Sequence, residues 1–204
     1  MQKKIIGIVG FIGSGKGTVG LHLTTQHNFR AVSFASSLKD AVSAIFNWPR
    51  DLLEGDTQES RQWREEPDEW WSKKLGRTAT PRWILQNIGT DIMRDHFHNN
   101  IWIWSLENRI RSIPQSVVIT DVRFENEVKM IRNLNGKIIW VKRGVDPEWL
   151  NTAMFTPGLM PELYPDVHSS EYRFLETKPD YIVHNNSSLV NLYTQIDNCI
   201  NINQ

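Results

Sequence analysis

Directly after the apolar run Ile5-Ile6-Gly7-Ile8-Val9, the chain reads Gly10-Phe11-Ile12-Gly13-Ser14-Gly15-Lys16-Gly17-Thr18. A buried strand, a glycine-rich turn and a helix in this order aim successive backbone N–H groups and the positive end of a helix dipole at one point. Lys16 adds a mobile positive charge there, which a turn kept only for its tightness would leave unexplained. The stretch therefore predicts a loop that binds a polyphosphate.

One position departs from the usual pattern of such loops. The residue after Lys16 is Gly17 rather than Ser or Thr. The hydroxyl that usually ligates magnesium is therefore displaced by one position, to Thr18. The Gly-Lys-Gly-Thr form resembles nucleoside monophosphate kinases more than motor or switch ATPases.

Composition limits the class of protein. A chain of 204 residues that is 40% hydrophobic can bury one good core, so we expect a single domain with insertions. Its formal net charge of zero argues against binding to an extended nucleic acid, and any anion site must be local. Nine tryptophans, most of them between Trp48 and Trp104, suit either a surface for flat rings or ordinary core packing.

Cysteine usage and the N-terminus bear on location. The single cysteine, Cys199, excludes an intramolecular disulfide and a cysteine-rich metal site, and it suits a reducing cytoplasm. No long apolar stretch precedes the glycine loop, so we expect neither a signal peptide nor a membrane span. The sequence predicts a soluble, cytoplasmic protein.

Short β-branched runs alternate with amphipathic segments along the rest of the chain. Strands are expected at about residues 5–9, 30–35, 116–121, 137–142 and 181–185. Helices are expected after the loop as far as His27, from Ser36 as a capped entry, from Thr80 to Ile92, and at about 101–110, 125–133 and 189–200. This alternation predicts an α/β fold of the P-loop NTPase type, with a central parallel sheet and helices on both faces.

Two segments interrupt this pattern. From Trp48 the periodicity gives way to a stretch rich in Trp, Arg and Glu, which we interpret as an insertion at about residues 48–100. Residues 144–176 hold four of the nine prolines and show no clear period. This second segment is expected to be a mobile loop or lid.

Four further stretches carry a resemblance to a known family. They are Phe34–Ala41, Arg82–Asp91 with Trp102 following, Asp121–Glu127, and His168–Glu171. In their order and spacing the chain resembles the bacteriophage deoxynucleoside monophosphate kinases, P-loop kinases distantly similar to adenylate kinase. The resemblance implies transfer of a phosphoryl group from ATP to a deoxynucleoside monophosphate, with Mg²⁺ as cofactor. It also implies the host cytoplasm as the location, if the chain is phage-encoded, and it leaves open whether the protein is a homodimer.

The donor side of such a site follows from the glycine loop. Phosphoryl transfer needs alignment of two nucleotides and cationic charge around the moving group rather than covalent help. Lys16 is expected to bridge toward the transferred group. The residues expected to hold the phosphates of ATP are Gly13, Ser14, Gly15, Lys16, Gly17 and Thr18.

Asp121 and Arg123 follow a predicted strand, and ligands of doubly wound sheets bind at the carboxyl ends of the strands. Asp121 is expected to hold Mg²⁺ through water or to orient the acceptor phosphate; the alternative is a cap on the next helix. Arg123 is a candidate for the transition-state charge, because a guanidinium matches phosphate oxygens in pairs. Its alternative is a surface salt bridge with Glu125 or Glu127.

The resemblance implies a second set of residues, for the acceptor. Lys39 and Arg82 begin amphipathic helices, where a solvated face is the ordinary role for a basic residue. Gly89 is read as permitting close approach of the acceptor, and Trp102 as packing on its base or sugar, with core packing as the alternative. The full set is Leu38, Lys39, Arg61, Arg82, Gly89, Thr90, Trp102, Asp121, Arg123 and Glu171. No residues at metal-ligand spacing accompany His168 and Glu171, so no protein-held metal site is predicted.

Two other functions compete with this one. The chain could be another P-loop small-molecule kinase of the dephospho-coenzyme A or shikimate type, or a non-kinase ATPase module. The second class usually carries a catalytic glutamate beside the strand-end acid, whereas Val122 follows Asp121 here. The expected ligands are small nucleotides, without a nucleic-acid polymer or a membrane; the accepted base stays open.

Overall fold

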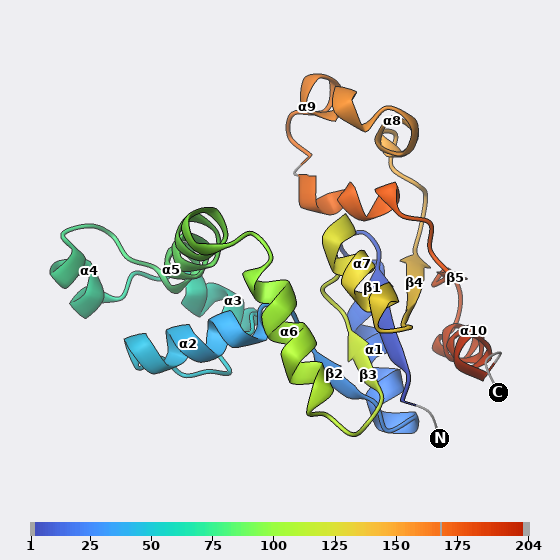
Figure 1. Ribbon diagram of the computed structural model, residues 1–204. Helices are drawn as coiled ribbons and strands as arrows, with labels where there is room; N and C mark the ends of the chain where they lie inside the picture. The colour runs from blue at the N-terminus through green and yellow to red at the C-terminus, as the bar shows by residue number, and fades with distance from the viewer. Residues whose placement is uncertain (1–2, 168, 202–204) are drawn as a thin grey trace. The chain divides into compact units, whose positions relative to one another are not determined.

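A computed structural model describes residues 3–167 and 169–201 (Figure 1). The chain divides into two compact units, one made of residues 1–33 and 109–204 and the other of residues 34–108. The first unit contains the glycine loop, and the second contains the whole of the insertion expected at residues 48–100. None of the helices in the described ranges combines the length and apolar character that crossing a membrane requires.

The first unit is built on a parallel sheet. In the described part of the chain its strands are β1 (Ile5–Val9), β2 (Arg30–Val32), β3 (Val117–Ile119), β4 (Lys137–Lys142) and β5 (Tyr181–His184). Their order across the sheet is β2-β3-β1-β4-β5, and every neighbouring pair is parallel. The glycine loop therefore leaves the middle strand, between β3 and β4, and the predicted parallel sheet is confirmed.

Helices cover both faces of this sheet, as predicted (Figure 1). Side chains alternate along β1: Ile6 and Ile8 join the core that includes residues of α1 (Lys16–Gln26) and α10 (Leu189–Asn201). Gly7 points to the opposite face, where α7 (Glu125–Asn133) packs so closely that a Cβ on Gly7 would lie 2.7 Å from Cδ1 of Ile131. Each face of β1 is thus occupied by different helices.

Residues 144–176 contain short helices where the sequence showed no period. They are α8 (Leu150–Phe155), α9 (Met160–Leu163) and the 3₁₀ turns Pro157–Leu159, Ser169–Glu171 and Arg173–Glu176. Ala153, Met160 and Tyr172 form a small core of their own. Helices of one or two turns are too short to generate a visible repeat, so the periodicity could not reveal them. The motion of this segment as a lid stays a prediction, and His168 lies outside the described residues.

The second unit is helical throughout its regular structure within residues 34–108. Its elements are α2 (Ser36–Phe46), α3 (Gln58–Glu65), α4 (Glu69–Leu75), α5 (Pro81–Gln86), a π-helix over Asn87–Phe97, and α6 (Ile101–Arg111), which continues into the first unit. Side-chain oxygens of Thr57, Asp68 and Thr80 accept hydrogen bonds from backbone N–H groups and start α3, α4 and α5. The cap expected at Ser36 differs, since α2 begins after Ala35 without a side-chain cap.

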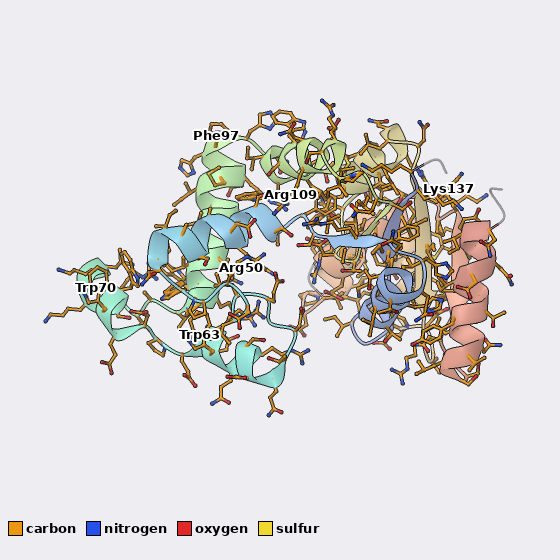
Figure 2. The ribbon with its side chains drawn as sticks, turned by 90° about the horizontal axis from the view of Figure 1, so that it is seen from below. Arg50, Trp63, Trp70, Phe97, Arg109 and Lys137 are labelled. Atoms are coloured by element: carbon orange, nitrogen blue, oxygen red, sulfur yellow. The ribbon has the colours of Figure 1, made fainter. Side chains whose placement is uncertain are left out.

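Most tryptophans of the second unit lie in its hydrophobic core or pack against it. Trp48 and Trp102 are buried in its core, and Trp63, Trp71 and Trp83 pack against that core. Trp70, on α4, is exposed, and Figure 2 shows it apart from Trp63 of α3. The core-packing alternative therefore accounts for most of the tryptophans in this unit. Ile92, expected on the buried face of its helix, is exposed, because the wider π-helical turn shifts the face that each residue presents.

Two leucines of α1 provide a matched test of this packing. Leu23 is 0% exposed and Leu21 is 61% exposed. Leu23→Ala should lower the free energy of unfolding by about 2–5 kcal/mol, because it removes buried methyl groups and leaves a cavity. Leu21→Ala should change it by less than about 0.5 kcal/mol. Urea unfolding followed by circular dichroism measures both, and similar losses in the two variants would contradict this assignment of the core.

Candidate active site

The glycine loop joins β1 to α1 through backbone conformations that favour glycine. Gly10, Gly13 and Gly15 have φ values of 149°, 77° and 103°. Space is also restricted at two of them: a Cβ on Gly10 would lie 2.5 Å from the carbonyl oxygen of Val141, and a Cβ on Gly15 would collide with the amide of Asn185. The predicted loop is present, and both its path and its neighbours require these glycines.

The first turn of α1 offers backbone donors to this loop. The first backbone bond of the helix is donated by Val19 N–H to the carbonyl of Gly15, at 3.1 Å. The N–H groups of residues 15–18 therefore have no acceptor inside the helix. Four such donors at a helix N-terminus form a site for an anion. The hydroxyl of Thr18 belongs to the same turn.

Lys16 lies across the loop. Its Nζ donates to the carbonyl oxygens of Gly10 at 2.7 Å and Phe11 at 3.0 Å, which leaves one of three N–H donors for another acceptor. Burial lowers the pKa of Lys16, the positive charge of Arg123 lowers it further, and Glu171 opposes both. The loop lysine and the arginine after β3 are thus within electrostatic range of each other.

Arg123 and Glu171, which are 48 residues apart, meet in the first unit. Nη1 of Arg123 lies 3.5 Å from Oε1 of Glu171. Glu125, one of the two partners considered from sequence, pairs instead with Lys129 at 2.7 Å. Lys16, Arg123 and Glu171 therefore form one charged group beside the glycine loop.

Glu127, which the sequence suggested only as a surface salt-bridge partner of Arg123, is a buried carboxylate that shapes the same turn. Glu127 is only 3% exposed, and its Oε2 accepts the backbone N–H groups of Arg123 at 2.7 Å and Phe124 at 3.1 Å. It stands at the third position of α7, where a capping glutamate reaches back to the start of the helix, so its spacing was the available signal. Glu127 thereby fixes the backbone that carries Arg123.

Asp121 follows β3 at the edge of the sheet where the glycine loop leaves β1. It is half-buried, and parallel pairing of β1 with β3 brings the two strand ends to the same edge. The residue at the N-cap of α7 is Phe124, and its backbone N–H is accepted by Glu127; both roles considered for Asp121 stay predictions. Asp121 therefore lies where a strand-end ligand is expected.

Other segments of the first unit hold the loop in place. Phe11 packs against Trp140 and Trp149, with ring centroids 6.0 and 5.0 Å away, and against Phe174 at 5.7 Å. Nδ2 of Asn185, just after β5, donates to the carbonyl of Ser14 at 2.9 Å. The loop is thus braced by β4, by the segment 144–176 and by the end of β5. Nothing in the local sequence signalled these partners.

In the second unit, two arginines contact the turn at Gly55 and Asp56, and a third is close enough to interact with one of them. Arg61 donates from Nε to the carbonyl of Gly55 at 3.0 Å and from Nη2 to that of Asp56 at 3.1 Å. The guanidinium of Arg64 lies against Gly55, where a Cβ would collide with it. Arg82 pairs with Glu65.

Arg64 stands out within this group. Burial lowers its pKa, and the positive charge of Arg82 adds to that effect. Its buried Nε has no hydrogen-bond partner among the residues that the structure describes. When burial and a neighbouring positive charge destabilise the charged form of a guanidinium, an anionic ligand stabilises it. Arg61, Arg64 and Arg82, called the arginine cluster from here on, are therefore the candidate anion site of the second unit; their binding role stays a prediction.

The other acceptor residues take mixed positions. Lys39 is mostly buried and pairs with Glu54 at 2.5 Å, so it is neither on a solvated face nor free of partners. Leu38 lies in the core and makes the close approach at Gly89, where a Cβ would be 2.6 Å from its Cδ2. The indole N–H of Trp102 donates to the carbonyl of Gly89 at 2.9 Å inside the same core. Thr90 is exposed. For these residues a binding role stays a prediction.

The chain is similar to known proteins over most of its length. The family model described as deoxynucleotide monophosphate kinase matches residues 69–196. A protein of Acanthamoeba polyphaga mimivirus with the provisional name deoxynucleotide monophosphate kinase is 32% identical over 209 residues, which cover 96% of this chain and 95% of that protein. Deoxynucleoside-5′-monophosphate kinase of Escherichia phage T5 is 44% identical over 57 residues, or 28% of this chain and 23% of that protein.

The fold has solved relatives. The crystal structure of TT1252 from Thermus thermophilus superposes with a TM-score of 0.52 at 16% identity, covering 100% of this chain and 98% of that one. At this identity the likeness concerns the fold alone.

Glu127 yields a test that needs no ligand. Glu127→Ala should lower the free energy of unfolding by about 1–3 kcal/mol, because it leaves the N–H groups of Arg123 and Phe124 without an acceptor. Glu127→Gln keeps an acceptor oxygen and should cost less than about 1 kcal/mol. Chemical denaturation of both variants gives the difference. Equal losses would show that the two hydrogen bonds are not what makes Glu127 stabilising.

Proposed function

We propose, because the chain belongs to the deoxynucleotide monophosphate kinase family, that it transfers the γ-phosphoryl group of ATP to a deoxynucleoside 5′-monophosphate. The products are the deoxynucleoside diphosphate and ADP. The observation that carries the proposal is the group of Lys16 and Arg123 beside the glycine loop, with their charges close enough to interact. Such a pair of cations suits the negative charge that spreads over a phosphoryl group in transfer.

The donor nucleotide is assigned to the first unit. The N–H groups of residues 15–18 and the glycine path would hold the β- and γ-phosphates, with the remaining N–H of Lys16 directed to the transferred group. Oxygen ligands suit Mg²⁺, and the residues that would hold it are Thr18, on the first turn of α1, and Asp121, at the end of β3. Mg²⁺ supplies charge neutralisation of the phosphates when bound.

Residues around Arg123 supply positioning. The backbone of Arg123 is fixed by the buried Glu127, and its guanidinium pairs with Glu171. Glu171 would orient Arg123 toward the phosphoryl group and limit the repulsion between Arg123 and Lys16, since its negative charge raises the pKa that both burial and Arg123 lower. The chain needs no general base for this role, because positioning and charge account for most of the catalysis of phosphoryl transfer.

The acceptor phosphate is assigned to the arginine cluster of the second unit. A dianionic phosphate monoester would satisfy the buried Nε of Arg64 and reduce the repulsion between Arg64 and Arg82. Lys39, Leu38, Gly89, Thr90 and Trp102 would shape the nucleoside site around it, Leu38 and Trp102 through the core packing at Gly89. Whether the protein forms a homodimer stays open, and its location in the cytoplasm of a host cell stays a prediction from the sequence.

A panel of acceptors tests the proposal. ADP release from MgATP should depend on adding dAMP, dGMP, dTMP or dCMP, with their ribose counterparts run in parallel. Lys16→Ala should lower kcat at least about 100-fold, as expected when a donor to the transition state is lost. Lys129→Ala, which removes an exposed lysine of α7, is the matched control and should leave the rate unchanged. Silence across the panel from folded protein that binds ATP would contradict the kinase assignment.

The arginine cluster has its own test. Arg64→Met keeps the apolar stem and removes the charge, so the KM for the monophosphate should rise at least about tenfold, the value of a lost charge-assisted hydrogen bond. The KM for ATP should not change. The free energy of unfolding should stay level or rise, because the variant removes a half-buried cation whose buried Nε has no hydrogen-bond partner among the described residues. Arg77→Met, at an exposed arginine of the same unit, is the control. An unchanged KM for the monophosphate would remove Arg64 from the acceptor site.

A further inference from the structure

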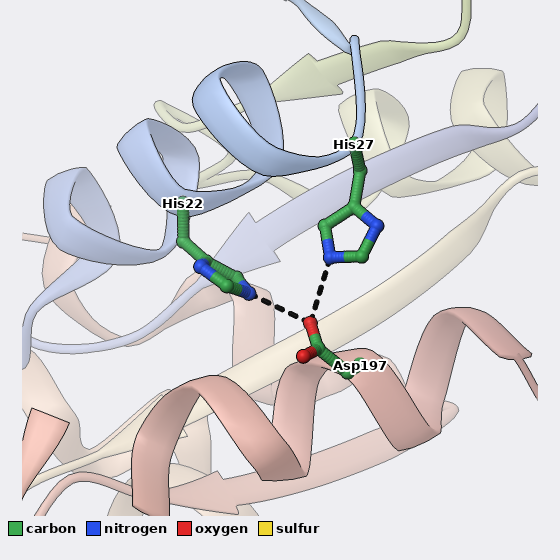
Figure 3. A group of neighbouring side chains, drawn as sticks. All are labelled: His22, His27 and Asp197. Atoms are coloured by element: carbon green, nitrogen blue, oxygen red, sulfur yellow. Dashed lines mark hydrogen bonds and ion pairs between the residues drawn. The ribbon is translucent and has the colours of Figure 1, made fainter. Parts of the chain in front are cut away.

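Two histidines and one aspartate meet on the first unit, away from the glycine loop. His22 lies in α1, His27 directly follows α1, and Asp197 lies in α10 (Figure 3). The Nε2 atoms of His22 and His27 lie 2.7 and 2.8 Å from the same oxygen, Oδ1 of Asp197. His27 is eleven positions beyond Lys16, roughly 16 Å along the helix axis. The group is therefore separate from the proposed nucleotide site.

Packing holds these donor atoms in place. The ring of His22 is buried and stacks on Tyr193, with centroids 4.1 Å apart and planes inclined by 3°. The ring of His27 meets that of His22 at 73°, with centroids 5.2 Å apart. Asp197 is 38% exposed, so the group opens to solvent on the side of its carboxylate. An ion could enter there without unfolding either helix.

The donor set suits a divalent transition metal ion. We propose that His22, His27 and Asp197 form a Zn²⁺-type site, with solvent in the fourth position. Two imidazole nitrogens and a carboxylate oxygen are ligands that Zn²⁺ accepts, whereas Mg²⁺ and Ca²⁺ prefer oxygen alone. The three ligand atoms already lie within 4.8 Å of one another. Tetrahedral bonds of about 2.0–2.2 Å place donor atoms about 3.4 Å apart, so the two distances from Nε2 to Oδ1 of Asp197 need to widen by less than about 1 Å.

The ion would join α1 to α10. Both helices pack on the same face of the sheet, and α1 is the helix that begins at the glycine loop. A metal bound across them favours the folded state, because the ligands are far apart in an unfolded chain. The role assigned to the site is therefore structural, and kinase turnover is expected to proceed without Zn²⁺ at it.

Calorimetric titration with ZnCl₂ tests the site. The whole chain is treated with a chelator, dialysed and titrated without nucleotide or Mg²⁺. We expect one Zn²⁺ per chain, with affinity at least about tenfold weaker in His27→Gln and in Asp197→Asn. Asp197→Asn keeps an oxygen that can accept hydrogen bonds, which preserves the packing of the two helices. His184→Gln, at an exposed histidine of β5, is the matched control and should bind like the parent chain.

Two further readouts distinguish a metal site from a hydrogen-bonded clasp. Co²⁺ should give the visible absorption of a tetrahedral ion with the parent chain and His184→Gln, and lose it with His27→Gln. Zn²⁺ should raise the thermal midpoint of the parent chain but not that of Asp197→Asn. Absence of saturable Zn²⁺ binding, or equal binding by the parent chain, His27→Gln and Asp197→Asn, would overturn the proposal and leave the group as a clasp.

Discussion

Parallel pairing of β1 with β3 and β4 is the constraint on which the rest of the first unit depends. It brings the carboxyl ends of these strands to one edge of the sheet, so the glycine loop, Asp121 and the residues after β4 share that edge. The chain turns sharply where it leaves β1. Glycine is needed in this turn, because Gly10 and Gly15 have positive φ values and neighbours too close for a side chain. In a different strand order, the residues that follow β3 would not lie beside the glycine loop, and Arg123 would not be close to Lys16.

Burial affects the charged residues around the glycine loop as much as ion pairing does. Burial and the positive charge of Arg123 lower the pKa of Lys16, and the negative charge of Glu171 raises it. Glu127 is buried yet fully used, because it accepts two backbone N–H groups of the turn that carries Arg123. One carboxylate, Glu127, thus fixes the backbone of Arg123, and another, Glu171, pairs with its guanidinium.

In the second unit, the residues that form the core differ from those proposed to bind the acceptor phosphate. Tryptophans, together with Leu38 and Gly89, form its core, whereas the arginine cluster lies around the turn at Gly55. Glu54 is held between Lys39 and Arg50; burial opposes its ionisation, but the hydrogen bonds from these two residues lower its pKa. Arg64 has no comparable partner among the described residues for its Nε, which is why we assign the acceptor phosphate to it rather than to Arg50.

The sequence by itself determined the glycine loop between its strand and helix, and most of the strands and longer helices of the first unit. The predicted helix 125–133 and strand 137–142 match α7 and β4, because period and β-branching act within a few residues. Short turns without a period, as at residues 144–176, could not be found this way. Only the tertiary structure decided which distant residues meet: Arg123 with Glu171, Leu38 with Gly89, and Asp197 with His27 across 170 positions. Such pairs depend on how elements far apart in the sequence pack against one another, and no local pattern records that packing.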